Sequence, residues 1–475
     1  MNFSRSYSGV LRNGSHCYSG MQITLGVFLV LLTVGCNSHS KDDFTTKTAQ
    51  RILTKAWSTT YPKILKAIQA PTFPDTTVVI ADTTDFRNSI NTAISRLSEN
   101  GGGMVKVNPG VYKVAGSIFL ASNIHLHFED GAELWFSPEP SDYLPVVKSR
   151  WEGTFLMNYS PLIYANATEN IAITGKGLIH GQSEKKWQYW KQRQDDDKKR
   201  LRQMGNDEIP LEERVFGEGH YLRPSAIELI NCQNILLEDF RIQGSPFWTI
   251  HPVLSENITI RSLNIGAGTT NDDGIDPESC KNVLIENCVI HTNDDCVAIK
   301  AGRDQDGWPY PPAENIIVRN TTFTTEVGSG FCIGSEMSAG VRNVFVEHCE
   351  VVQSGKHAFQ FKSNPDRGGF IENIFIRNIT IGTAKYGFEF TTDYKGWRGN
   401  EYFTKYQDFY FQDIQIEKAK AKSIVIKGRP EAPIRKVYFE NCSIDRSPQL
   451  EIVLEATQVL FKNTKINANT LPTNK

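Results

Sequence analysis

Residues 269–300 read TTNDDGIDPESCKNVLIENCVIHTNDDCVAIK, and this stretch decides the fold. It contains two acidic clusters, at 271–276 and 293–295, with an aliphatic run between them. Asp273 and Asp294 are 21 residues apart, close to one coil of a solenoid with repeats of roughly 20–30 residues. Adjacent coils stack at about 5 Å, so we expect the carboxylates to converge on one exposed outer face. Repulsion there raises the pKa of at least one carboxyl group and leaves others ionised, as acid and base catalysis requires.

A short phrase recurs along the chain: asparagine, aliphatic residue, any residue, aliphatic residue. It begins at Asn170, Asn234, Asn257, Asn282, Asn315, Asn343 and Asn373. From Asn234 onward the intervals are 23, 25, 33, 28 and 30 residues, too long for β-hairpins and suited to coils of two or three short strands. The repeat predicts an all-β protein folded as a right-handed parallel β-helix. Each strand would pair with its equivalent one coil away, and the asparagines would bond the backbone at the turns.

The first 36 residues are typical of an export signal. Arg5 and Arg12 precede an apolar run at 23–34, which is too short to span a bilayer. Gly35-Cys36 at its end resembles a bacterial lipoprotein processing site, so we expect Cys36 to be acylated and the protein to be exported, as a periplasmic or outer-membrane lipoprotein. Plain secretion with an incidental Cys36 is the alternative. We expect membrane contact only through this anchor.

The segment between the signal and the repeats is predicted to be helical in part. Residues 37–75 are expected to be a leader packed on the body. A helix capped by Thr84 follows, and Gly101–Gly103 ends it. Its apolar residues recur at helical spacing, at Phe86, Ile90, Ala93, Ile94 and Leu97. Such an N-terminal helix can cap the open end of a solenoid, whose edge would otherwise invite aggregation.

Residues 76–475 are predicted to form one β-helix domain. A highly charged insertion at 183–214, with Trp187 and Trp190, interrupts the repeat. It is either a solvated helical insertion or one wall of a carbohydrate cleft. The formal net charge of −2 is too nearly neutral to indicate nucleic acid as a partner.

Seven cysteines follow the targeting segment, namely Cys232, Cys280, Cys288, Cys296, Cys332, Cys349 and Cys442. They form no CxxC pair and the histidine spacing does not suit zinc, so we expect neither a metal site nor a cofactor. We interpret those within strand-like surroundings as small hydrophobic residues that fill the interior.

The polar residues outside the repeated phrase align on successive coils. They are Asp272, Asp273 and Asp276, then Asp294 and Asp295 with Lys300 and Arg303, then Gly328 to Glu336, then Gln360 to Ser363 with Arg367. This is an acidic centre with a cationic flank, which suits hydrolysis of an acidic polymer. Carboxylates would transfer protons, while Lys362 and Arg303 would bind carboxylates of the ligand.

These motifs resemble glycoside hydrolase family 28, the polygalacturonases and related pectin hydrolases. Asn271 to Asp276 matches the family's Asn-x-Asp-Gly-x-Asp signature, Asp294-Asp295 its paired acids, Gly328 to Ser335 its glycine-rich loop, and Lys362 the lysine of its Arg-Ile-Lys. The resemblance implies that Asp294 is the general acid and that Asp273 and Asp295 activate water. That is an inverting mechanism, with carboxylates roughly 6.5–9.5 Å apart.

The resemblance and the coil alignment together predict the substrate-binding residues, which are Asn271, Asp276, Arg303, Ser329, Gln360, Lys362 and Arg367. Ser329 and Gln360 stand where the family usually has histidine and arginine, and His357 or Arg367 could compensate. Some of these residues also have a purely structural interpretation. Asp272 and Asp276 could cap turns, and Lys362 and Arg303 could be solvated charges.

We therefore expect a monomeric enzyme that cleaves α-linked galacturonic acid in pectic polysaccharide or oligogalacturonide. The departures at Ser329 and Gln360 favour a decorated or mixed backbone, so a rhamnogalacturonan or xylogalacturonan hydrolase is the alternative. A calcium-dependent pectate lyase shares the architecture, but acids outnumber bases at the centre. The alternative outside the enzymes is a non-catalytic β-helix that binds carbohydrate. We interpret His251 as a buried, hydrogen-bonded histidine. Arg223 either pairs with an acid of the cleft or lies on the surface.

Overall fold

The asparagines of the repeated phrase begin the strands of one long parallel sheet. The computed structural model describes residues 44–81, 84–447 and 452–473. All seven asparagines adopt the left-handed conformation, with φ between 53° and 60°, which asparagine tolerates better than most residues. Most of their side-chain amides bond to the asparagine one coil away, as Asn315 Nδ2 does to Asn282 Oδ1 at 3.0 Å. The turn at which each coil restarts is thus set by one residue type.

The strands that begin with this turn form the first of three sheets. They are β1 (Thr77–Ile80), β2 (Gly103–Val107), β5 (Ile124–Phe128), β10 (Glu169–Gly175), β14 (Gln233–Glu238), β17 (Glu256–Arg261), β19 (Lys281–Glu286), β22 (Ala313–Arg319), β25 (Val341–Glu347), β27 (Phe370–Thr391), β28 (Lys405–Lys427), β29 (Ile434–Glu440) and β32 (Thr457–Lys462). Every pairing among them is parallel. The pairing advances one coil at a time, as in β14 to β17 to β19.

The second sheet follows after a short bend in each coil. Its strands are β3 (Gly110–Val114), β6 (Ala132–Phe136), β11 (Leu178–His180), β15 (Arg241–Gln243), β18 (Asn264–Ile265), β20 (Val289–Thr292), β23 (Thr322–Thr325), β26 (Glu350–Lys362), β30 (Ser443–Arg446) and β33 (Lys465–Ile466), with β34 (Asn469–Thr470) added antiparallel. The long strands β26, β27 and β28 bend from one sheet into the next.

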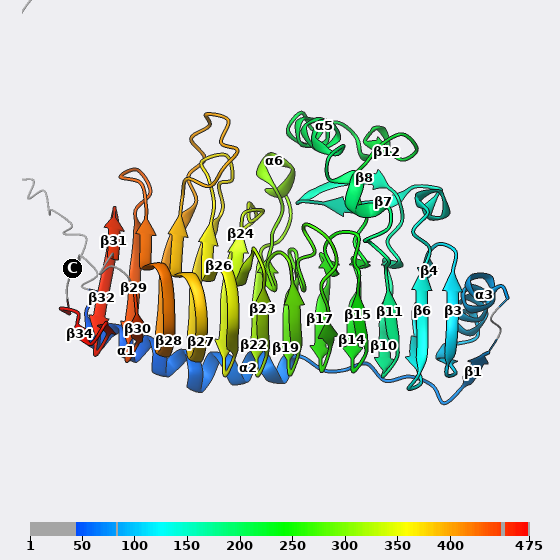
Figure 1. Cartoon of the computed structure of the whole chain (residues 1–475), viewed down its shortest axis with the longest axis horizontal. Helices are drawn as coiled ribbons and strands as arrows, with labels where there is room; N and C mark the ends of the chain where they lie inside the picture. Colours follow the sequence, from blue (N-terminus) through cyan, green and yellow to red (C-terminus); the bar gives the residue numbers. More distant parts are fainter. Residues whose placement is uncertain (1–43, 82–83, 448–451, 474–475) are drawn as a thin grey trace, which may run out of the picture. The chain divides into compact units, whose positions relative to one another are not determined.

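The third sheet carries the candidate site. Its strands are β4 (Ile118–Phe119), β9 (Ile163–Asn166), β13 (Ile227–Ile230), β16 (Ile250–Val253), β21 (Val297–Ile299), β24 (Ser329–Gly334) and β31 (Ile452–Glu455), joined by parts of β26, β27 and β28. Inward residues of all three sheets stack into one continuous core, which includes all the described cysteines except Cys332; each of the seven is buried and unpaired. The fold is a right-handed parallel β-helix, as the sequence predicts (Figure 1).

Helix α3 (Phe86–Glu99) packs against the first coils and closes that end of the core (Figure 1). Its buried residues are the five that the apolar spacing predicts. The N-cap is Asp85 rather than Thr84, and the helix ends before Gly101 and Gly102, whose φ values are 96° and 97°. Glycine is needed there because Gly102 N donates to Leu97 O at 2.8 Å while a Cβ on Gly102 would lie 2.3 Å from Asn123 O.

The segment before β1 lies along the outside of the first sheet. Helices α1 (Thr46–Lys55) and α2 (Tyr61–Ala67), with a π-helical turn η1 at Ala56–Thr60, pack their apolar residues on outward side chains of β19 to β32. Figure 1 shows them as a belt across several coils. The expected signal and acylation site, up to Cys36, lie outside the described residues. Among those described, no helix is long and apolar enough to cross a membrane.

A covering layer lies over the third sheet on the side of the earlier coils. It consists of the hairpin β7 (Val147–Trp151) and β8 (Thr154–Asn158), strand β12 (Val215–Phe216), and helices α4 (Trp187–Trp190) and α5 (Asp195–Asn206). The short turns η2 (Pro140–Tyr143) and η3 (Leu211–Glu213) flank it, and α6 (Asp304–Gly307) rises beside it from the coil that contains β21 (Figure 1). Trp187 and Trp190 are buried against Tyr143 and Tyr159, so they hold this layer in place and do not line a cleft.

Candidate active site

The coil register brings the acidic clusters together on the outside of the third sheet. Gly274 N donates to Asp295 O at 2.9 Å, and Cys296 N donates to Ser329 O at 2.9 Å. Ser329 in turn is the parallel partner of His357. Asp273, Asp295, Ser329 and His357 therefore occupy neighbouring positions on four successive coils. This convergence is the one that the 21-residue spacing predicts.

Asp272 holds the turn that presents Asp294. Its Oδ1 accepts hydrogen bonds from Asn293 N and Asp294 N, both at 3.0 Å, and its Oδ2 accepts from Gly268 N at 2.7 Å. Asp272 is 1% exposed. The turn-capping interpretation of Asp272 is thus the one that the contacts support.

Asp295 is surrounded by donors. Its Oδ1 accepts from Ser329 N at 2.7 Å, and its Oδ2 accepts from Lys362 Nζ at 2.8 Å and from Cys332 Sγ at 3.2 Å. Burial alone would raise the pKa of this carboxyl group, but the ammonium groups of Lys362 and Lys300 outweigh burial and hold its pKa well below the ordinary value. Asp295 is therefore the ionised member of the cluster.

Asp294 and Asp273 are shifted in the opposite direction. Burial, reinforced by the charge of Asp295, raises the pKa of Asp294, whose Oδ2 accepts from Asn271 Nδ2 at 3.2 Å. Burial and the charge of Asp276 raise the pKa of Asp273, although Lys300 Nζ lies 3.3 Å from its Oδ2. One site thus contains carboxyl groups whose pKa is raised beside one whose pKa is lowered, which is the division that acid and base catalysis requires.

The carboxylates are less exposed than the sequence led us to expect. Asp273 and Asp295 are 4% and 3% exposed, and Asp294 is half-buried. The prediction of an exposed outer face is therefore wrong for the first two. Lys300 Nζ lies against the Asp273 carboxylate and Lys362 Nζ against that of Asp295, and the burial of both carboxyl groups contributes to the pKa shifts above.

Residues 217–465 match the family described as Glycosyl hydrolases family 28. This match spans more than half of the chain. The chain belongs to glycoside hydrolase family 28. It is therefore a glycoside hydrolase, and its motifs lie in the expected order.

Named relatives agree with this membership. The chain is 29% identical over 376 residues to a "Probable polygalacturonase" of Vitis vinifera, covering 76% of this chain and 71% of that one. It is 27% identical to an endo-polygalacturonase of Pectobacterium carotovorum subsp. carotovorum, covering 76% and 84%. Among solved structures, a hyperthermoactive exopolygalacturonase from Thermotoga maritima is 37% identical and superposes with a TM-score of 0.82, covering 89% of this chain and 96% of that one.

The two departures from the family motifs share one hydrogen-bonded cluster. Ser329 Oγ lies 3.3 Å from His357 Nδ1 and 3.3 Å from Gln360 Oε1. Glu389 Oε2 accepts a hydrogen bond from Gln360 Nε2 at 2.7 Å and lies 3.0 Å from His357 Nε2. His357 also stacks on Tyr386, at 5.1 Å between ring centroids. An imidazole from the next coil thus lies where the family's own histidine is missing.

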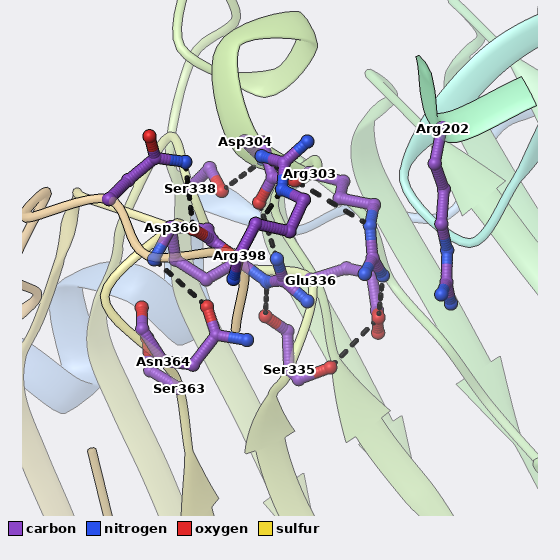
Figure 2. A network of polar contacts seen from close by, with 12 residues as sticks. Arg202, Arg303, Asp304, Ser335, Glu336, Ser338, Ser363, Asn364, Asp366 and Arg398 are labelled. Atoms are coloured by element: carbon purple, nitrogen blue, oxygen red, sulfur yellow. Dashed lines mark hydrogen bonds and ion pairs between the residues drawn. The ribbon is translucent and has the colours of Figure 1, made fainter. Parts of the chain in front are cut away.

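Two other expected binding residues, Asp276 and Arg367, are buried beneath or beside the carboxylate cluster. Asp276 is fully buried, and among the residues that the structure describes neither of its carboxylate oxygens has a hydrogen-bond partner. Burial raises its pKa to about 7, although Lys300 and His251 oppose this. Arg367 is 1% exposed and bonds to Ser335 O at 2.8 Å and to Asp304. Asp304 Oδ2 also lies 3.8 Å from Arg303 Nε, so Arg367 belongs to the polar network around Asp304 and Arg303 that Figure 2 shows.

Several contacts at the site were not predicted from the sequence. Lys300 lies beside Asp273, and Lys362 faces the ring of Tyr394 at 5.4 Å. Lys191 Nζ, from the insertion, donates to Asn271 Oδ1 at 3.0 Å, as does Arg223 Nη2 at the same distance. The coil alignment predicts Lys300 on the cationic flank of the acids, and the register agrees, because Lys300 aligns with Gly334 and then Lys362. No periodic signal connects Lys191 or Tyr394 to the centre, since both lie in irregular segments.

The covering layer closes one side of the site. Arg150 Nε pairs with Glu278 Oε1 at 2.6 Å, and Ser149 Oγ donates to Glu228 Oε2 at 2.8 Å. His251, between these two glutamates, is fully buried, as its sequence context predicts; its Nδ1 lies 3.3 Å from Glu228 Oε1 and its Nε2 lies 3.1 Å from Glu278 Oε2. On the later coils, Glu389 and Thr391 are half-buried and Lys427 is exposed. The outward face of the third sheet is therefore covered before the coil of Asp294 and Asp295, stays buried on the next two coils, and becomes accessible from β27 onward.

Proposed function

We propose that this enzyme hydrolyses the α-linked galacturonan of pectin from a chain end, by an inverting mechanism. The observation that carries the proposal is the grouping of Asp273, Asp294 and Asp295 beside the buried ammonium groups of Lys300 and Lys362. Carboxyl groups of opposite protonation state suit glycosidic hydrolysis. Cations at the same place suit a sugar that itself carries a carboxylate.

In this mechanism Asp294 is the general acid. Its raised pKa keeps the proton that the leaving glycosidic oxygen must receive. Asp295, held ionised by Lys362, accepts a proton from water that attacks the anomeric carbon on the opposite face. Asp273, beside Lys300, orients that water. The glycosidic bond breaks as the new carbon–oxygen bond forms, so the product has inverted configuration.

The covered side of the site supports action at a chain end. A polymer that passed through the site would have to occupy the outward face on both sides of the catalytic coil. On the earlier side, Glu228, His251 and Glu278 are fully buried beneath the hairpin β7–β8. The 37% identical neighbour is named an exopolygalacturonase, in agreement with this reading.

We propose in addition that the protein is exported and anchored through Cys36, on the grounds of the apolar run at 23–34 and the Gly35-Cys36 pair. Its partner is then pectic polysaccharide outside the cytoplasm. Labelling with a radioactive fatty acid, with Cys36→Ser as control, tests the anchor; export without label would leave plain secretion.

The test of the activity is product analysis on polygalacturonate, with rhamnogalacturonan and xylogalacturonan in parallel. We expect galacturonate or one short oligomer from the first reaction times, with the inverted anomer seen by proton NMR. A ladder of intermediate sizes would contradict action at a chain end. Retained configuration would contradict the roles of Asp273 and Asp295, and an unsaturated ultraviolet-absorbing product would indicate a lyase.

A further inference from the structure

We propose that Lys191 and Arg223 fix the side-chain amide of Asn271, and that this amide directs the proton of Asp294 to one of its two carboxyl oxygens. The inference rests on the proposed function, in which Asp294 is the general acid. Lys191 and Arg223 act through Asn271, so they are positioning residues. Because Lys191 lies within residues 183–214, the insertion takes part in catalysis.

The Asn271 side chain joins the two cations to the acid. Its Oδ1 accepts a hydrogen bond from Lys191 Nζ at 3.0 Å and another from Arg223 Nη2 at 3.0 Å. Its Nδ2 donates to Asp294 Oδ2 at 3.2 Å. The amide oxygen has two lone pairs, and cationic donors use both. A rotated amide would place its NH2 group against two positive charges, so the cations hold the donor side toward Asp294.

The fixed amide distinguishes the two carboxyl oxygens of Asp294. Oδ2 accepts from Asn271, whereas Oδ1 has no hydrogen-bond donor among the residues that the structure describes. A protonated carboxyl group has one O–H donor and one carbonyl acceptor. Because Oδ2 is used as the acceptor, the proton lies on Oδ1. Asp294 is only half-buried, and Oδ1 is therefore the oxygen that can meet the glycosidic oxygen.

The two cations are held in place by the insertion and by the coil beneath it. Arg223 is fully buried; its Nε donates to Gln194 Oε1 at 3.3 Å and its Nη1 to Pro246 O at 3.0 Å. Lys191 and Gln194 both lie in the turn between helices α4 and α5, which follows the buried Trp190. Supporting contacts of this kind keep a catalytic group in its productive geometry.

The ammonium group of Lys191 is committed to this contact. Within the described part of the chain, Asn271 Oδ1 is its one hydrogen-bond acceptor, and it forms no ion pair. Burial lowers the pKa of Lys191, although the charge of Glu152 opposes this. A partly desolvated ammonium attracts an amide oxygen more strongly than one in water does. Removing it should therefore loosen the orientation of the amide.

The test compares Lys191→Met with Lys186→Met, the same change at a lysine of the insertion that is 50% exposed and pairs with Glu139. For Lys191→Met we expect kcat on trigalacturonate to fall about three- to tenfold, the loss usual for one hydrogen bond, with KM within about twofold. Lys186→Met should change neither constant. Lys191→Arg, which keeps a cationic donor, should recover part of the loss.

The pH profile separates positioning from a general loss of stability. The basic limb of kcat/KM reports loss of the proton from the general acid. When Asn271 no longer donates reliably to Asp294, the carboxylate form is less stabilised and its pKa rises. For Lys191→Met the basic limb should therefore move to higher pH by about half a unit to one unit. An unchanged limb and an unchanged kcat in the folded variant would overturn the inference, even if Tm were lower.

A double-mutant cycle tests whether Lys191 acts through Asn271. Asn271→Gly removes the amide at a position where φ is 62°, which glycine adopts readily. We expect this variant to lose at least as much kcat as Lys191→Met, and Lys191→Met to add less than twofold in its background. Additive losses, or a rise in KM as the only effect of Lys191→Met, would overturn the inference. If Asp294→Asn kept its activity, the proposed function itself would fail, which distinguishes the two failures.

Discussion

Lys362→Gln should move the acid limb of the pH profile, because Lys362 sets the ionisation of Asp295. Its Nζ lies 2.8 Å from Asp295 Oδ2 and both side chains are nearly buried. At an effective dielectric constant of about 20, two unit charges at that distance attract by roughly 6 kcal/mol. Desolvation cancels much of this. An opposite charge at such range lowers a carboxyl pKa by about 1–3 units.

The direction of the change follows from the causes of the shift. Burial alone raises the pKa of Asp295, and the two lysines reverse that effect. Without the charge of Lys362, the effect of burial on the pKa of Asp295 is less opposed, so Asp295 is protonated at a higher pH. The base is then lost as pH falls, so the acid limb of kcat/KM should move to higher pH by about 1–3 units.

The assay is reducing-sugar release from trigalacturonate across the pH range, with Lys427→Gln as the control. Lys427 occupies the position equivalent to Lys362 two coils further along. It is exposed, and its Nζ lies 3.6 Å from Glu455 Oε1. The control should leave the acid limb in place. If Lys362→Gln lowers activity and its acid limb coincides with that of wild type, Lys362 only binds substrate and the reasoning is refuted.

Three further predictions concern the acid, a buried histidine and the family departure. Asp294→Asn should lower kcat about 10²- to 10⁴-fold with Tm unchanged; residual activity within tenfold of wild type would exclude Asp294 as the general acid. The pKa of His251 is raised to about 9 because Glu228 and Glu278 outweigh burial, so its contribution to stability is present below about pH 6.5 and lost as pH rises through 9. His251→Gln should then lower unfolding free energy at pH 6 by about 3 kcal/mol, and denaturant titrations at pH 6 and pH 9.5 should show a smaller difference between variant and wild type at the higher pH. His357→Gln should lower kcat/KM on the order of tenfold, and equal kinetics would show that this imidazole does not replace the family's histidine.

Much of the fold was readable because the β-helix repeats itself in sequence. The asparagine at the start of each coil must adopt positive φ, and few other residues do so readily, so the period is visible without coordinates. The capping helix was visible because Phe86, Ile90 and Ile94 face one core. The limits of prediction appear at irregular segments, such as the insertion, where Trp187 and Trp190 proved to be buried supports.

The candidate site, too, could be predicted only in part. Asp273, Asp294 and Asp295 were found because one coil separates their clusters, and stacking at a fixed spacing converts that interval into proximity. The same reasoning predicts Asp276 and Arg367 as binding residues, but Asp276 is fully buried and Arg367 is bonded to Ser335 and Asp304. Side-chain access depends on the loops above the coils, and loop paths carry no period.

The sequence by itself determined the solenoid, its period and the coils that carry the acids, since these follow from local turn preferences and strand pairing. Only the tertiary structure decided which carboxyl group holds its proton more tightly, because the charges of the neighbouring lysines outweigh burial at Asp295 but not at Asp294. Only the tertiary structure, too, closed one side of the site. The covering hairpin and the insertion meet the catalytic coil through contacts such as Arg150 with Glu278 and Lys191 with Asn271, which join residues 128 and 80 positions apart.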